Sequence, residues 1–521
     1  MSKFNRAGTR PAGRGPITSE QTPTGRTFEG GTGFAREARS ELFLLAVANM
    51  VGENTFYEAA GERDSRFRAL VHELAVADPE WLTGMIGWLR GEGNMRSASL
   101  VAALEGAKAR VDAGAHGHSR QMVDAALQRA DEPGEALAYW TSRYGRAIPK
   151  PVKRGIADAV ARLYTERAVL KYDTGSKGYR FGDVLNLVHA SPSADKPRQK
   201  ALFAHAHERQ HNRAGGPDPS ALPVLAANAT LVEAARTEPA LLLVPEQLKR
   251  AGVAWESALS LAGDRVDKAR LWEALIPSMG YMALLRNLRN FDQAGVSDEV
   301  AEQVAARLAD PELVARSRQL PMRFLSAYRA APSLRWGLAL EKALKASLAN
   351  ITELSGRTLV LVDRSGSMQG RLSARSDLNR ADAAAIFGTA LAMRCESADL
   401  VAFGTNSEKV PFQRGDSLLR AIDRFGWMGG TNTSAAVARH FRDHDRVVIV
   451  TDEQAHHYWG GNPTEQVPAS VPVYTWNLAG YERGHGPSGD GNRHTFGGLS
   501  DAAFRMVPLI EAGRSADWPW V

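Results

Sequence analysis

Apolar side chains recur at helical spacing over residues 34–350, and Pro, Gly and Asp interrupt the pattern where strand-like alternation is absent. Asp78 and Asp310 are each followed by Pro and Glu, which is typical of a capped helix start. Glu132 and Glu238, each followed by Pro, are weaker versions of the same signal. The pattern predicts about sixteen helices joined by short loops, which we expect to stack as helix pairs in a solenoid.

A different pattern begins near residue 356. Residues 358–362 form an uncharged run of Leu, Val and Thr, and residues 446–451 form a second apolar run. Such runs are typical of strands that are covered on both faces. A helix is expected to begin near Arg380, between the two strands. Residues 356–521 are therefore predicted to form an α/β domain with a doubly wound parallel sheet.

Oxygen-bearing side chains follow both predicted strands. Asp363, Ser365 and Ser367 form a DxSxS pattern after the first strand, Asp452 ends the second, and Thr431 lies in a glycine-rich loop. The carboxyl ends of parallel strands meet at one edge of a sheet, so these side chains are expected to converge. Hard oxygen ligands favour Mg²⁺, Ca²⁺ or Mn²⁺ over Zn²⁺. The alternative is a solvated turn with a capping aspartate.

Composition constrains the remaining possibilities. The chain has 521 residues and a net charge of +6, with the basic surplus before residue 356, which is compatible with a polyanionic partner. Residues 1–33 are rich in Gly, Thr, Arg and Pro and are expected to form a flexible tail. An apolar membrane span and a signal peptide are both absent from the pattern, which predicts a cytoplasmic protein. The single cysteine, Cys395, is expected to pack in an apolar helix.

Two segments of the helical part could bind RNA. A helix over residues 281–291 would place Leu284 and Leu288 on one face and Arg286 and Arg289 on the opposite one. Arginine pairs with phosphate and stacks on bases, although an ordinary solvated helix face is the simpler interpretation.

The second segment, residues 171–192, is a basic loop that leads into a helix. Tyr172 and Tyr179 lie among its cations and could stack on bases, while the alternative is an ordinary loop. The candidate RNA contacts of this segment are Lys171, Lys177, Arg180 and His189.

These motifs together resemble the Ro autoantigen family, in which a TROVE domain precedes a von Willebrand factor A domain. The pieces that match the TROVE domain are FEGGTGFAREARSELFLLAVANM, the KY loop with DVLNLVH, WEALIPSMGYMALLRNLRNF and LPMRFLSAY. A metal-ion-dependent adhesion site is resembled by three further pieces, which are DxSxS, GGT and the strand-ending Asp. Tyr179 stands where the family usually has tryptophan, and Ser191 replaces a lysine. The loop is also about one residue longer than usual.

The resemblance implies a flexible tail (1–33), a HEAT-like helical ring (34–350) and an A-like domain (356–521). In such a protein Ser365, Ser367 and Thr431 would ligate a divalent cation, with Mg²⁺ the first choice, and Asp363 and Asp452 would act directly or through water. Lys171, Lys177 and His189 match the family's RNA-contacting loop and helix. The implied function is that of a bacterial Ro homologue, a scaffold that binds small non-coding, Y-like RNA and single-stranded ends of misfolded RNA in quality control or processing.

Other functions stay open. Motifs for a serine hydrolase, a phosphate loop, a CxxC pair and an HExxH site are absent from the sequence, so we expect no enzyme. His456 and His457 could ligate a metal, but adjacent side chains in an extended segment point apart. One alternative is a protein-binding adaptor that uses the metal site, with a ribonuclease as one possible partner. Another is a metal-dependent nuclease or phosphatase, for which a general base is not evident.

Overall fold

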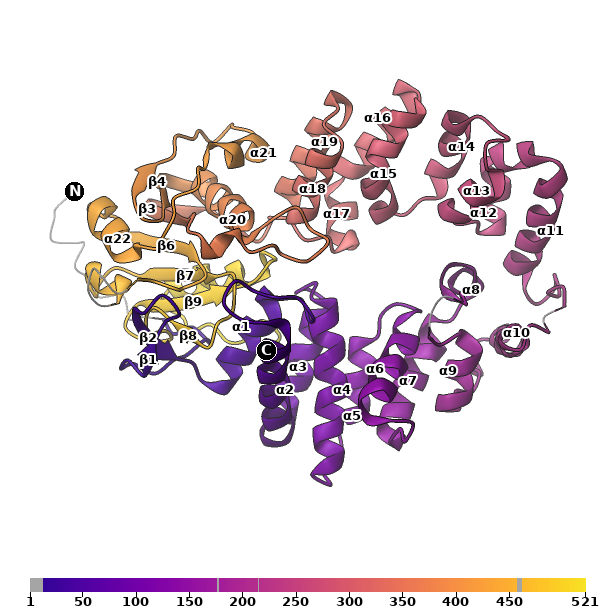
Figure 1. Cartoon of the computed structure of the whole chain (residues 1–521), viewed down its shortest axis with the longest axis horizontal. Helices are drawn as coiled ribbons and strands as arrows, with labels where there is room; N and C mark the ends of the chain where they lie inside the picture. Colours follow the sequence, from indigo (N-terminus) through magenta and orange to yellow (C-terminus); the bar gives the residue numbers. More distant parts are fainter. Residues whose placement is uncertain (1–12, 176–177, 214, 457–461) are drawn as a thin grey trace.

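A computed structural model describes residues 13–175, 178–213, 215–456 and 462–521. Within these residues, nineteen α-helices, α1 to α19, precede a six-stranded sheet. Figure 1 shows the helices as two rows that run from the α/β domain to α10 and α11, where the chain turns back. The helical ring and the α/β fold are both confirmed.

The helices of the ring have these bounds: α1 Ala38–Ala48, α2 Ala60–Ala77, α3 Pro79–Arg90, α4 Arg96–Asp112, α5 Ser119–Ala126, α6 Glu132–Tyr144, α7 Lys150–Leu163, α8 Glu166–Tyr172, α9 Phe181–Val188, α10 Gln199–Gln210, α11 Pro223–Thr237, η2 Pro239–Leu243, α12 Pro245–Ala251, α13 Trp255–Ala262, α14 Lys268–Leu275, η3 Ile276–Ser278, α15 Tyr281–Ala294, α16 Asp298–Ala309, α17 Pro311–Ser317, α18 Met322–Ala330 and α19 Leu334–Ala346. Two predicted helix starts are confirmed, because Asp78 accepts from the Trp81 amide and Asp310 from the Glu312 amide.

The elements of the α/β domain are β3 Leu354–Asp363, η4 Ser367–Gln369, α20 Arg380–Arg394, β4 Cys395–Phe403, β5 Ser407–Lys409, α21 Leu418–Ala421, η5 Ile422–Arg424, α22 Thr433–His440, β6 Arg446–Thr451, η6 Pro463–Gln466, β7 Val473–Asn477, β9 Arg493–Gly497, η7 Ala502–Arg505 and α23 Met506–Glu511. Its strand order is β5-β4-β3-β6-β7-β9, and all neighbours are parallel except β4 and β5.

Strand β3 shows why the sheet is covered on both faces. Val360 and Val362 belong to the apolar cluster that contains α20, whereas Leu359 and Leu361 belong to the cluster that contains α22. Successive side chains of a strand point to opposite faces, so an unbroken apolar run requires a helix on each side. Cys395 is a buried packing residue as expected, but it is the first residue of β4, directly after α20, and not part of the helix.

The two rows of helices are joined at the end far from the sheet. Glu166 of α8 accepts hydrogen bonds from the amides of Val224 and Leu225, at 2.8 and 2.9 Å, at the start of α11. A carboxylate at this position satisfies free amides and opposes the helix dipole. Nearer the sheet, Arg318 at the end of α17 donates to Gln128 at 2.6 Å, which joins the rows again.

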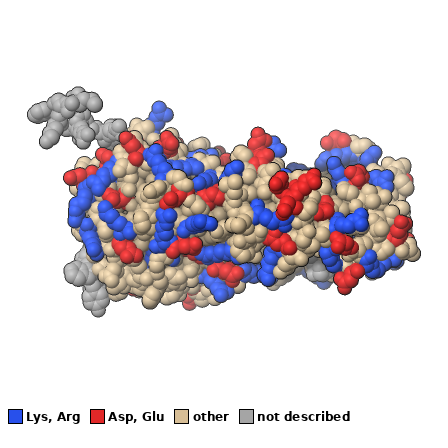
Figure 2. Space-filling model, turned by 90° about the horizontal axis from the view of Figure 1, so that it is seen from above, with Lys and Arg blue, Asp and Glu red and all other residues tan. Residues whose placement is uncertain are grey.

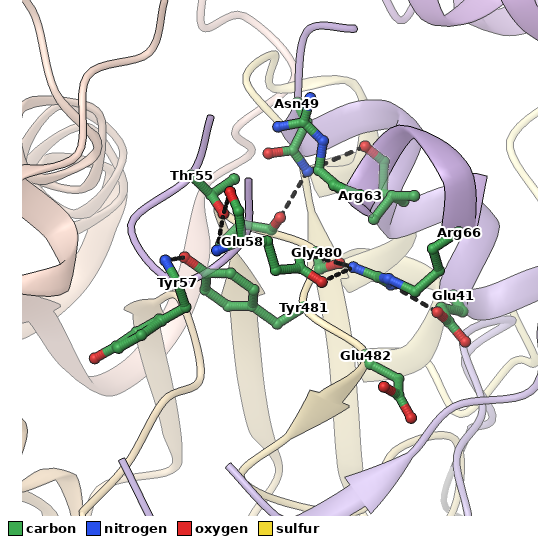
Figure 3. A network of polar contacts seen from close by, with 12 residues as sticks. Glu41, Asn49, Thr55, Tyr57, Glu58, Arg63, Arg66, Gly480, Tyr481 and Glu482 are labelled. Carbon is green, nitrogen blue, oxygen red and sulfur yellow. Dashed lines mark hydrogen bonds and ion pairs between the residues drawn. The ribbon is translucent and has the colours of Figure 1, made fainter. Parts of the chain in front are cut away.

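The α/β domain closes the ring by contacting both rows. Arg380 of α20 donates to Asn49 after α1 at 2.9 Å, and Glu341 of α19 accepts from the Leu418 and Leu419 amides of α21. Figure 3 shows a further part of the junction, where Arg66 of α2 bridges Glu41 and Glu58 and donates to the Gly480 carbonyl.

Residues 13–33, which were expected to belong to a flexible tail, are instead packed against the α/β domain. Strands β1 (Gly25–Arg26) and β2 (Thr32–Ala35) form a three-stranded sheet with β8 (Arg483–Gly484). Ile17 is fully buried, and its carbonyl accepts from the Ser488 hydroxyl at 2.7 Å. The composition suggested a tail because the segment has few large apolar side chains of its own, and some of its hydrogen-bond partners, such as Ser488, lie more than 400 residues away in the sequence. Residues 1–12 lie outside the described part.

The end of the chain crosses in the other direction, from the α/β domain to the ring. Trp518 and Trp520 stack on each other with ring centroids 5.4 Å apart, and both contact Trp81 of α3. Each terminal segment therefore packs on the domain that is remote in sequence, which fastens the two domains together.

Candidate functional site

The predicted oxygen cluster lies at the carboxyl ends of β3 and β6. These strands are neighbours, and the chain leaves β3 for β4 on one side and returns to β6 on the other. This reversal is the switch point at which open α/β sheets bind ligands. Asp363 ends β3, Asp452 follows β6, and Thr431 precedes α22. The five predicted donors are all buried: Asp363, Ser365, Ser367, Thr431 and Asp452.

Hydrogen bonds hold the cluster in place. Asp363 accepts from the Ser365 amide at 2.9 Å and from the Thr451 hydroxyl at 2.6 Å, and the hydroxyls of Ser365 and Ser367 are 3.2 Å apart. The Gly430 amide donates to the hydroxyl of Thr405 at 2.7 Å, which positions the glycine-rich loop. The predicted residues are therefore brought together, whereas the supporting residues Thr451 and Thr405 were missed, because a hydroxyl beside a strand end carries no distinct sequence signal.

The electrostatics of the cluster favour a bound cation. Burial raises the pKa of Asp363, and burial together with the Asp363 charge raises the pKa of Asp452 to about 7. Oδ2 of Asp452 is buried without a hydrogen-bond partner among the described residues. An uncompensated buried carboxylate is unfavourable unless it is protonated, paired or bound to a metal.

The donor set fits a hard divalent cation. It consists of two carboxylates and three hydroxyls, and within the described residues there is no cluster of three or more His, Cys, Asp or Glu side chains suited to a metal. Oxygen donors suit Mg²⁺ or Ca²⁺ and are poor for Zn²⁺. The residues present therefore fit the cation that the sequence pattern predicts.

Two residues beside the cluster come from the first sixty residues of the chain and were missed by sequence reasoning. The Tyr57 hydroxyl donates to Glu29, and the charge of Asp452 helps to raise the pKa of Tyr57, after burial and the Glu29 hydrogen bond. Glu29 also pairs with His456 at 3.2 Å, so His456 is engaged with a carboxylate, and His457 lies outside the described residues. In Figure 3 the Tyr57 amide faces the Tyr481 hydroxyl.

The basic loop between α8 and α9 presents some of its predicted RNA contacts to solvent. Lys171 and His189 are exposed, and His189 ends α9 in the left-handed backbone region with φ of 57°. Arg180 is partly committed to the fold, since it donates to the Arg209 carbonyl at 2.8 Å. Lys177 lies outside the described residues.

The helix predicted over residues 281–291 is α15, in the other row of the ring. Leu284 and Leu288 are buried, whereas Arg286 and Arg289 are exposed, as the periodic pattern predicts. The Arg286 charge contributes, after burial, to a lowered pKa of Arg323 on α18, so two cations lie near each other here. Sequence reasoning missed Arg323, because it is brought close only by helix packing.

Charge is mixed on the face seen in Figure 2, where basic and acidic side chains alternate along the length of the molecule. A polyanion that binds this face would therefore rely on local clusters of cations. Among the described residues, no helix is both long enough and apolar enough to cross a bilayer.

The protein is a ring of paired helices that is closed by an α/β domain. The switch point of that domain is lined by oxygen atoms. The TROVE domain family model matches residues 246–379. The crystal structure of the Deinococcus radiodurans Ro (RSR) protein superimposes with a TM-score of 0.60 and 18% identity, covering 91% of this chain and 99% of that one. Residues 246–379 are thus similar to the TROVE domain, and the chain as a whole has the fold of the Ro (RSR) protein.

Two curated relatives match over a short stretch. Telomerase protein component 1 of Mus musculus and that of Rattus norvegicus are each 45% identical over 76 residues. The match spans 14% of this chain but 3% of those much longer proteins. The TROVE match supports an RNA-binding function for the helical ring.

Proposed function

We propose that this protein is a cytoplasmic, non-catalytic scaffold that binds small non-coding, Y-like RNA and single-stranded ends of misfolded RNA during quality control or processing. The observation that carries the proposal is the TROVE match within a ring of the Ro type. Exposed cations on both rows, Lys171 near α9 and Arg286 and Arg289 on α15, would neutralise phosphates.

The α/β domain supplies a second candidate function, a metal-dependent protein-binding adaptor. The specific observation in its favour is that Oδ2 of Asp452, within a cluster of oxygens, is buried and has no hydrogen-bond partner in the described part of the chain. We propose that Ser365, Ser367 and Thr431 hold Mg²⁺ directly, with the two aspartates acting directly or through water. A bound Mg²⁺ would supply positive charge for a partner carboxylate, for example one on a ribonuclease.

RNA binding is tested by sequencing the RNA that copurifies with the intact protein and by measuring Kd for the most enriched RNA at several salt concentrations. A Lys171→Glu/His189→Ala variant should bind more weakly and show a shallower dependence of log K on log salt. The matched control is Arg420→Glu/Arg439→Glu, which alters two exposed arginines of the α/β domain. Retention of no RNA above an unrelated control protein at moderate salt would remove the scaffold proposal.

The adaptor function is tested with RNase-treated protein. Protein partners are captured in Mg²⁺ and in EDTA, with wild type and Asp363→Ala. A complex that needs both Mg²⁺ and Asp363 supports the adaptor, and a partner set that is unchanged by either treatment contradicts it. Cleavage of labelled RNA by wild type but not by Asp363→Ala would instead favour the nuclease alternative.

A further inference from the structure

A cavity of about 200 Å³ lies beside the basic loop, between α6, α8 and the start of α9. Its walls include three tyrosines, Tyr164, Tyr172 and Tyr179, and two carboxylates, Asp131 and Glu135. Binding pockets for small planar ligands typically combine apolar or aromatic walls with a few placed polar groups. The cavity has this composition and opens next to residues that were considered above as RNA contacts.

The inner wall of the cavity carries a polar group without a protein partner. Tyr164 is 3% exposed and stacks on Phe181 with ring centroids 3.8 Å apart. Its hydroxyl is buried and has no hydrogen-bond partner among the described residues. Burial, together with the charges of Asp173 and Asp131, raises the pKa of Tyr164, so the hydroxyl stays protonated and can donate. Buried hydroxyls are normally hydrogen-bonded, so the Tyr164 hydroxyl is an unused donor at the wall of the cavity.

Positive side chains lie beside Tyr172 at the cavity, whereas a negative side chain lies in its buried part. At the side of Tyr172, the Lys171 ammonium lies 5.1 Å and the Arg129 guanidinium 5.6 Å from the centre of the tyrosine ring. The carboxylate of Asp131, by contrast, is buried and pairs with Arg129 at 2.7 Å. A phosphate would be attracted to the two cations and repelled by the carboxylate, so the cavity itself does not suit a phosphate.

We propose that this cavity holds one unpaired nucleobase that carries an exocyclic amino group, with the adjoining phosphates outside on Lys171 and Arg129. Aromatic rings stack on any base, which gives affinity without sequence preference. Asp131 pairs with Arg129 and Glu135 pairs with Arg96. A carboxylate offers about four lone-pair sites, so beside such a pair it can also accept a hydrogen bond from an amino group, as Asp and Glu do from the amino group of cytosine. Adenine and cytosine therefore fit the site better than uracil, which has no amino group. This inference rests on the proposed RNA-binding function, and it specifies that an unpaired base of the RNA enters the cavity.

The test compares fluorescently labelled single-stranded RNA of about eight nucleotides, a length within the usual range for one binding site. Oligo(A), oligo(C) and oligo(U) are titrated into the full-length protein, three cavity variants and one control variant. We expect wild type to bind oligo(A) and oligo(C) more tightly than oligo(U). Tyr172→Ala should weaken binding by roughly tenfold through loss of stacking.

Tyr164→Phe separates a binding role from a structural one. It removes a buried hydroxyl that has no protein partner, so the melting temperature should stay equal or rise while the preference for amino-bearing bases decreases. Ala138→Phe is expected to fill the cavity from α6 and to abolish the preference. Thr230→Phe, an exposed position on α11, is the control for an added aromatic ring.

The outcomes distinguish this inference from the proposed function. If the most enriched copurifying RNA binds all variants as well as wild type, and the three oligonucleotides bind wild type equally, the cavity is not a base site but the scaffold function stands. If neither that RNA nor any oligonucleotide binds, the scaffold function itself is wrong. A Tyr164→Phe protein that melts at lower temperature and keeps its base preference would show that the hydroxyl has a structural role, which overturns the proposal.

Discussion

Replacing Asp452 by asparagine should stabilise the metal-free protein at neutral and alkaline pH. Asn retains the acceptor oxygen that Asp452 offers to the Gln454 amide, at 3.1 Å, and removes the charge that stands beside Asp363. In the metal-free protein the pKa of Asp452 rises from 3.8 to about 7, mainly through burial and then through Asp363. A folded carboxyl with a raised pKa binds its proton more tightly than the unfolded chain does.

The sign and size of the effect follow from this difference. Below about pH 4 Asp452 is protonated in both states and has no effect on the free energy of unfolding. Between about pH 4 and 7 the unfolded chain loses the proton first, so this group makes the folded state progressively less stable. A shift of about three pH units corresponds to about 4 kcal/mol at most, which should be reached above pH 7. The free energy of unfolding of the Asp452→Asn variant does not decrease in this way, because asparagine does not titrate.

Urea unfolding from pH 4 to 8, followed by tryptophan fluorescence in EDTA, measures the difference. The control is Glu408→Gln, which removes an exposed carboxylate of β5 in the same domain. Mg²⁺ at 100 times its Kd should restore about 2.7 kcal/mol to wild type and nothing to Asp452→Asn. The reasoning fails if Asp452→Asn is less stable than wild type at pH 8 in EDTA, or if Mg²⁺ stabilises both proteins equally.

Three further changes test how the domains are fastened. Gly31→Val should weaken the packing of the N-terminal segment by about 1–3 kcal/mol, because a Cβ at Gly31 would lie 2.4 Å from the Ala455 carbonyl oxygen. Limited proteolysis measures this effect, and a variant in which residues 13–35 stay as protected as in wild type would contradict the prediction. Trp520→Ala removes the stacking on Trp518 and α3 and should lower the free energy of unfolding by roughly 1–3 kcal/mol, measured by urea titration against Val521→Ala as an exposed control. Burial would raise the pKa of Glu341, but hydrogen bonds from the α21 amides lower it overall, so its stabilisation is present above about pH 4.5 and is lost as pH falls through the lower folded value. Glu341→Gln should therefore be less stable than wild type at pH 7, by a margin that decreases as the pH falls below about 4.5, and a margin that does not change between pH 7 and pH 3 would refute this.

The ligand cluster of the α/β domain was predictable because each donor directly follows a strand or precedes a helix that the apolar pattern defines. Strand β6 has the predicted bounds, Arg446–Thr451, and α20 begins at Arg380 as expected. The residues that support the cluster, Thr451 and Thr405, were not predictable, since hydroxyls are common in loops and at strand ends. Tyr57, in the loop between α1 and α2, and Glu29, in the turn between β1 and β2, reach the same place from the far end of the sequence.

The sequence by itself determined the helical and α/β parts, the faces of α15 and the five oxygens at the switch point, because these depend on local periodicity and on short motifs. Tertiary structure alone decided that residues 13–33 are packed, that Trp518 and Trp520 return to the ring, and that three tyrosines enclose a cavity beside Lys171. Local patterns record which face of an element is buried. They do not record which distant element covers it, because apolar burial is non-directional and any complementary surface satisfies it.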